Sequence, residues 1–85
     1  MVVNVPATPT QLLNLSQYRE VYFQVLSGVN VLIASDQSTL ATPVSGVQGG
    51  LQLSQAQGVV RLPWTGTMWI MATDPNGGLA NVEVV

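Results

Sequence analysis

The stretch Arg61-Leu-Pro-Trp-Thr-Gly-Thr-Met-Trp-Ile-Met-Ala72 holds both tryptophans of this 85-residue chain. A Thr-Gly pair separates them, and Gly66 can take a positive φ without steric cost, so we expect a turn between the two tryptophans. After the turn, apolar side chains recur at every second residue, which is the period of a β-strand with one buried face. We expect Trp64, on the other side of the turn, to pack a corner of a β-structure.

The same alternation assigns faces to the residues after the turn. If Met68 and Ile70 fill the core, Trp69 and Met71 lie on the outer face of the sheet. An apolar pair on a charge-poor surface typically marks a contact with a partner. Two other interpretations stay open: both faces of the sheet are covered and Trp69 belongs to the core, or Trp64 and Trp69 form a platform on which sugar rings stack.

Two-residue alternation also governs the rest of the chain, and the clearest strand is residues 18–26, followed by a Ser-Gly connection and a returning strand at 29–34. A single flat sheet could not bury its apolar residues together, namely Val21, Phe23, Ile33, Leu53, Leu62, Ile70 and Val82. Further short strands are expected at residues 2–5, 11–15, 50–54, 58–62, 67–73 and 79–85. The sequence therefore predicts one all-β domain over residues 1–85, a small antiparallel β-sandwich or jelly-roll-like barrel of six to eight short strands.

Charge is scarce in this chain: charged residues make up 7% of it, against about 25% in a typical soluble domain. A neutral surface rich in amides and hydroxyls suits a protein that is packed against partners. With two arginines and a net charge of -2, the chain lacks the basic surface that binds nucleic acid.

No apolar run approaches the roughly 20 residues of a membrane span, and the N-terminus lacks the basic and apolar regions of a signal peptide.

The residues needed for catalysis or metal binding are missing. Histidine, cysteine and lysine are absent, so nothing activates a serine or threonine as a nucleophile. Asp74 and Asn76 resemble the start of a calcium loop, but the twelfth position, counted from Asp74, is Val85. We expect a turn there, and no enzyme activity, cofactor, metal or small-molecule substrate.

Four residues are expected to have a structural role, holding parts of the β-structure in place. Arg19 shares a face with Val21, so its stem is expected along the core edge with its guanidinium bonded to loop carbonyls or to a carboxylate. Arg61 has the same role. A salt bridge to a neighbouring subunit is the alternative for both arginines. Trp64 and Gly66 complete the set.

Taken in order, these features resemble a group of small β-sandwich virion proteins of tailed bacteriophages. An arginine introduces a strand that ends in Gln and an aliphatic residue, here residues 19–25, and a paired strand follows at 29–33. The matching segments are Thr8-Pro-Thr-Gln-Leu-Leu13, Gly50-Leu-Gln-Leu53, Trp64-Thr-Gly-Thr-Met-Trp-Ile-Met-Ala72 and Asn81-Val-Glu-Val84. The family's charged segment before the arginine is replaced here by Leu15-Ser-Gln-Tyr18.

The resemblance implies a capsid decoration, or cement, protein that is assembled in the host cytoplasm into the virion. Its partners would be the major capsid protein and neighbouring copies of itself, and a homotrimer would suit the three-fold sites of capsid lattices. We expect Tyr22, Trp69 and Met71 on a partner-facing surface. We also expect the N-terminal strand, with Val2 and Val3, and the loop at 35–50 to reach toward neighbours. The alternatives are a head–tail connector, a head-fibre base or a tail component, a glycan-binding module, and a host-directed protein outside the particle.

Overall fold

The computed structural model describes residues 1–41 and 50–85, and in this part of the chain six strands form one antiparallel sheet. The strands are β1 (Val2–Val5), β2 (Thr10–Val25), β3 (Val31–Ala34), β4 (Leu51–Leu53), β5 (Val59–Ala72) and β6 (Gly78–Val84), in the spatial order β1-β6-β2-β5-β3-β4. A short helix, α1 (Gln37–Ala41), and a 3-10 turn, Gln55–Gln57, complete the described elements. The expected all-β class is confirmed.

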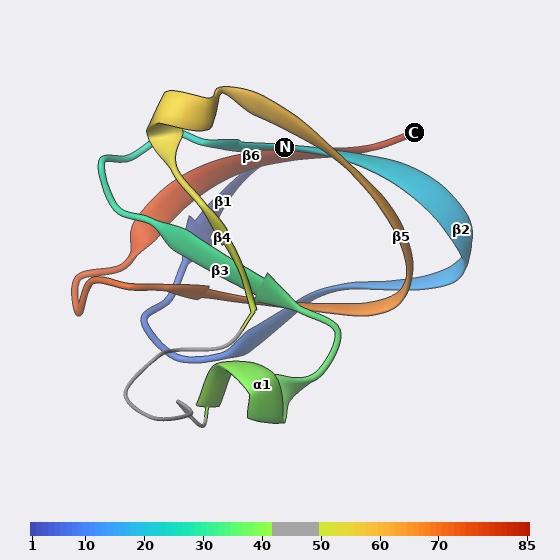
Figure 1. Ribbon diagram of the computed structural model, residues 1–85, viewed down its shortest axis with the longest axis horizontal. Helices are drawn as coiled ribbons and strands as arrows, with labels where there is room; N and C mark the ends of the chain where they lie inside the picture. Colours follow the sequence, from blue (N-terminus) through green and yellow to red (C-terminus); the bar gives the residue numbers. More distant parts are fainter. Residues whose placement is uncertain (42–49) are drawn as a thin grey trace.

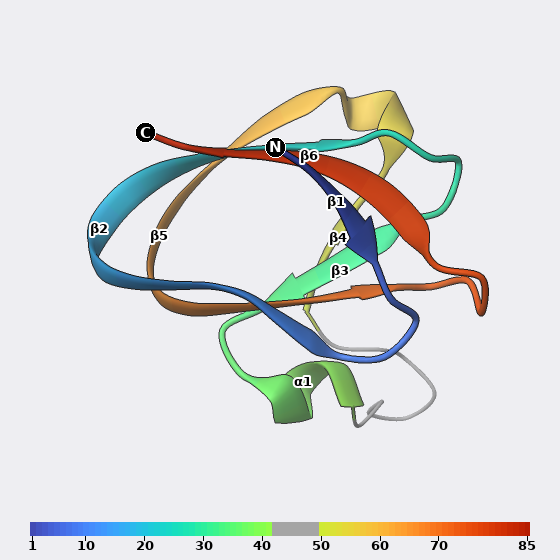
Figure 2. The same cartoon turned by 180° about the vertical axis from the view of Figure 1, so that it is seen from behind.

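The long strands β2 and β5 give the sheet its shape. Each contains two of the strands expected from the sequence, because the pairing continues across the segments that had been read as breaks. Residues 19–24 of β2 pair with residues 59–64 of β5, and residues 10–15 pair with residues 66–70. Figures 1 and 2 show the two strands curving together around one end of the molecule, so that the sheet curls into a half-barrel.

The bend has a local cause on each strand. In β2 the register shifts between Leu15, which pairs with Gly66, and Arg19, which pairs with Trp64, so that three residues of β2 face a single residue of β5. Extra residues on one strand bend it and increase its twist. On β5, Gly66 has a φ of 79°. The expected Thr-Gly turn is therefore a bend within a continuous strand.

The curled sheet encloses one main core. Phe23, Met68 and Ile70 are among its fully buried side chains, and the seven apolar residues that a flat sheet could not bury together are all buried here. The Ala72 N–H donates to the carbonyl of Pro6 at 2.8 Å, which joins the end of β5 to the chain just beyond β1. Curling thus achieves what stacking two separate sheets would achieve.

Helix α1 builds a second, smaller core on the outside of the sheet. Its Leu40 is fully buried and packs with Leu32, Ala34 and Met71 on the outer side of β3 and β5. The sequence did not predict this helix, which replaces part of the loop expected at 35–50. The rest of that loop, residues 42–49, lies outside the described residues.

We predict that Gly66→Ala lowers the free energy of unfolding by about 1–2 kcal/mol, the penalty for an L-residue in the left-handed region. No atom lies within 4 Å of the added Cβ, so backbone strain accounts for the loss. Urea denaturation of both proteins measures it. Gly28→Ala is the matched control, because Gly28 has equal free space and does not have a positive φ. If the two substitutions had equal effects, the bend would not depend on the conformation of Gly66.

Candidate functional site

One side of the curled sheet is left uncovered by the part of the chain that the structure describes. The register places Val2, Asn81, Gln24 and Val59 in a row across β1, β6, β2 and β5, all pointing away from the core. The neighbouring row holds Glu83, Tyr22 and Arg61. We call this surface the outer face and define it by its apolar members: Val2, Tyr18, Tyr22, Leu26, Val59, Leu79 and Val85.

Most of the exposed apolar surface of the described residues is concentrated here. Seven of the nine large hydrophobic side chains that are exposed belong to the outer face, and the other two are Met1 and Leu51. Tyr18 is 66% exposed, Val2 62% and Val59 61%. Single exposed apolar residues are ordinary, but the gathering of seven on one side of a sheet is typical of an interaction site.

Charges on the outer face are paired. Arg61 donates from Nη2 to Oε1 of Glu20 at 3.0 Å and from Nε to Oε2 of the same carboxylate, a two-pronged ion pair. The hydrogen bond to Glu20, and then its charge, raise the pKa of Arg61. The N-terminal ammonium contacts Glu83 and donates to Oδ1 of Asn81 at 2.9 Å. Such exposed pairs add little stability, but Glu20 neutralises Arg61 within the apolar surroundings.

The residues expected to face a partner do not lie on one common surface. Tyr22 and Val2 lie on the outer face, whereas Val3 points inward and is half-buried against the main core. Trp69 and Met71 are on the outer side of the sheet as the alternation predicted, but in the half covered by α1. Met71 is only 6% exposed because Leu40 packs in the same cluster, which corrects the expected exposure of Met71.

The two tryptophans do not form a common surface. Trp64 packs against the main core, and its Nε1 donates to the carbonyl of Thr67 at 3.1 Å. Trp69 packs against the second core, beneath α1, with Met71 and Leu32. The stretch from Arg61 to Ala72 therefore supplies one tryptophan to each side of β5. The two rings do not form a stacking platform.

Both arginines bond within the chain. The Nε of Arg19 donates to the carbonyl oxygen of Val85 at 3.0 Å, and the N–H of Val85 donates to the carbonyl of Glu20 at 2.9 Å. These bonds tie the end of the chain to β2. Arg61 holds the side chain of Glu20, as described above. Each arginine thus links strands of this chain to one another.

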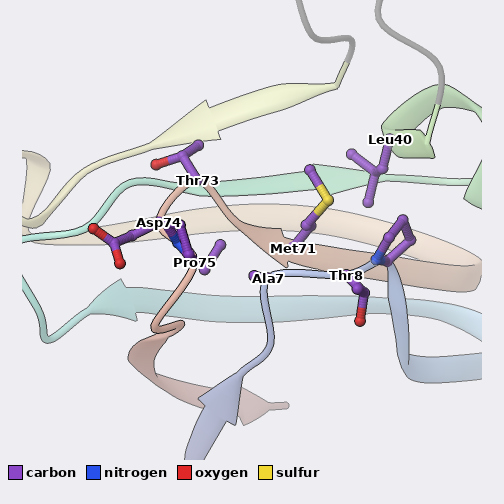
Figure 3. Close-up of a pocket in the computed structure, with 9 residues that line it drawn as sticks. Ala7, Thr8, Leu40, Met71, Thr73, Asp74 and Pro75 are labelled. Atoms are coloured by element: carbon purple, nitrogen blue, oxygen red, sulfur yellow. The ribbon is translucent and has the colours of Figure 1, made fainter.

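An open hollow lies on the other side of the molecule, with a volume of about 490 Å³ (Figure 3). The segment before β2, the end of β5 and α1 form it, so no sequence motif could have indicated it. Its lining residues are Ala7, Thr8, Pro9, Leu40, Met71, Ala72, Thr73, Asp74 and Pro75.

Among the described residues that line this hollow, Asp74 is the one carboxylate, and its Oδ1 already accepts the Asn76 N–H at 2.8 Å. The Gly77 N–H donates to the Asp74 carbonyl at 2.9 Å, so the turn expected in this segment is present. No group of three or more His, Cys, Asp or Glu side chains that could hold a metal ion occurs among the described residues. The described lining thus offers an apolar floor together with the hydroxyls of Thr8 and Thr73.

Comparison with protein-family models, with curated proteins and with solved structures finds no match for this chain. None of the helices in the described ranges, 1–41 and 50–85, is long and apolar enough to cross a membrane.

The cover over Met71 depends on the cap of α1. Oδ1 of Asp36, directly before the helix, accepts the Ser38 hydroxyl at 2.7 Å and the Thr39 N–H at 2.9 Å. These hydrogen bonds hold the pKa of Asp36 below its usual value of 3.8. Because the folded-state pKa is the lower one, the cap contributes stability above the unfolded pKa and loses it as the pH falls through the folded pKa.

We predict that Asp36→Ala removes most of the helical Cα chemical shifts of residues 37–41 at neutral pH, measured by NMR. In the unaltered chain the same shifts should decline only on acidification below about pH 4, near the unfolded carboxyl pKa. Asp36→Asn is the matched control, because its side-chain oxygen still caps the helix without titrating. Helical shifts that survive Asp36→Ala would show that the Leu40 contact alone holds α1.

Proposed function

We propose that this chain is a structural virion protein that attaches to the outside of a tailed-phage head as a decoration protein, and that the outer face is its docking surface. The observation that carries the proposal is the gathering of seven exposed apolar side chains on one bare side of the sheet. The phage head is proposed from the sequence resemblance, and the choice of the outer face is supported by the exposed apolar side chains that lie on it.

The composition of the outer face suits a protein partner. Tyrosine is enriched in the cores of protein interfaces, where its ring contributes area and its hydroxyl a hydrogen bond, and Tyr18 and Tyr22 are both exposed here. A shallow depression of about 180 Å³ lies beside Tyr22 and Val59, large enough for one partner side chain. The ion pair of Arg61 with Glu20 lets the surrounding apolar area be covered without leaving either charge alone.

A decoration role needs contacts and no chemistry. Many copies on a symmetric shell each add a modest contact, and the shell as a whole becomes more resistant to rupture. A head–tail connector, a head-fibre base or a tail component would use the same surface in fewer copies. The glycan-binding alternative has lost its main support, since Trp64 and Trp69 belong to different cores.

We predict that Val59→Glu, a substitution at the β5 end of the row that crosses the outer face, removes the chain from purified phage particles. It should change the free energy of unfolding by no more than about 0.5 kcal/mol, because Val59 is exposed. Leu51→Glu is the matched control: Leu51 is 47% exposed but lies off the outer face, so this variant should still be incorporated. Equal incorporation of both variants would mean that docking uses another surface.

The role itself is tested by quantitative mass spectrometry of gradient-purified particles. Copies in a simple ratio to the major capsid protein would support decoration of the head. A small fixed number per particle would place the chain in a connector, a head-fibre base or a tail. Absence from the particle would overturn the virion proposal.

A further inference from the structure

We propose that β1 is a self-complementary edge through which two copies of this chain pair, antiparallel, into a dimer with a continuous twelve-stranded sheet. The proposal concerns the backbone of β1, and it holds whether or not the chain is a virion protein. It makes use of an edge that the outer-face docking leaves free.

The hydrogen-bond pattern fixes which groups of β1 are available. Met1 and Val82 exchange two backbone bonds, because the N-terminal ammonium donates to the Val82 carbonyl at 3.1 Å and the Val82 N–H donates to the Met1 carbonyl at 2.8 Å. In an antiparallel pair such positions alternate, so Val3 and Val5 also bond to β6. The N–H and C=O groups of Val2 and Asn4 therefore face away from β6.

The opposite edge of β6 confirms this alternation. The Leu26 N–H donates to the Leu79 carbonyl and the Val85 N–H donates to the Glu20 carbonyl, each at 2.9 Å. Odd-numbered residues of β6 thus bond to β2, and the even-numbered ones are left for β1.

In the described part of the chain no strand pairs with the second edge of β1, which ends the sheet order. Figure 2 shows β1 with β6 along one side. The bond from Ala72 reaches Pro6, one residue past the end of β1, and among residues 1–41 and 50–85 no such bond reaches the outward groups of Val2 or Asn4. Edges of this kind are normally blocked by charge, by proline or by a bulge. The sequence Val-Val-Asn-Val has none of these, and its register with β6 is regular.

A second copy fits this edge by symmetry. With a two-fold axis at Val3, Val2 of one copy stands opposite Asn4 of the other, and each such pair exchanges two backbone bonds, four in all. The contact is isologous and closes at two copies. The homotrimer expected from capsid symmetry would instead need a head-to-tail contact, which a self-complementary edge does not supply. A second copy is the partner we propose, because its own β1 offers an edge of the same length with no charge or proline to oppose the pairing.

The test is sedimentation equilibrium of the purified full chain over a range of concentrations. We expect a reversible dimer. Asn4→Pro removes the outward N–H without touching a bond to β6, and it should raise the dimer dissociation constant at least about tenfold. Asn4→Ala keeps the N–H and is the matched control, which should stay within about twofold of the unaltered chain. Circular dichroism establishes that both variants fold.

Hydrogen exchange of the unaltered chain gives a readout that does not depend on a variant. Exchange of the Val2 and Asn4 amides should slow as the concentration rises through the dissociation constant. A chain that is monomeric at every concentration would overturn the proposal, and so would a dimer that Asn4→Pro leaves intact. A virion test that fails while the dimer forms through β1 would overturn the proposed function alone.

Discussion

The joint bend of β2 and β5 is the constraint on which the rest of this structure depends. Two long paired strands can curve sharply only if both change conformation at the same level, and here a shift of register in β2 faces Gly66 on β5. The chain has no disulfide that could hold the curve. Once the curve exists, the two halves of the strand pair face each other and Phe23, Met68 and Ile70 become inaccessible to water. Removing the bend would leave one face of an extended sheet exposed, which a chain of this size could not offset elsewhere.

The bend also gives the sheet two unlike exteriors. On the half that contains β3 and the end of β5, the outer side carries Leu32 and Met71, and α1 covers them. On the half that contains β1 and β6, the outer side carries apolar residues with no helix above them. One sheet therefore has a covered exterior and a bare one. That asymmetry, rather than any single residue, is the physical reason for proposing an interaction on one side of the sheet.

Particular residues show how much of the structure the sequence could predict. The alternation after Gly66 assigned Met68 and Ile70 to the core and Trp69 with Met71 to the opposite side, as observed. It could not show that α1 covers Met71, because a helix of five residues is too short to have a periodic signal. The only local indication was Asp36 three residues before Thr39, the spacing of an N-cap.

The outer face could not be predicted from the sequence, for a different reason. Its members lie on four strands or directly after them, and each of them alone is an ordinary exposed residue. Only the register brings Val2 next to Asn81 and Val59 next to Gln24. The polar Ser16 and Gln17 had suggested a break between two strands. They lie instead where β2 shifts its register against β5. The two-residue alternation is interrupted there, so the sequence pattern indicates the end of a strand although the strand continues.

The bare face and the free edge of β1 meet at Val2, whose side chain belongs to the face and whose backbone belongs to the edge. Pairing about an axis perpendicular to the sheet at Val3 would keep both outer faces on the same side of the joined sheet. A dimer of that form presents two identical apolar surfaces in one direction, at a fixed separation. Attachment of the first surface to a repetitive partner then makes attachment of the second intramolecular, and the overall affinity exceeds that of either contact. A small domain with a shallow docking surface would gain most from such an arrangement, because each single contact is weak on its own.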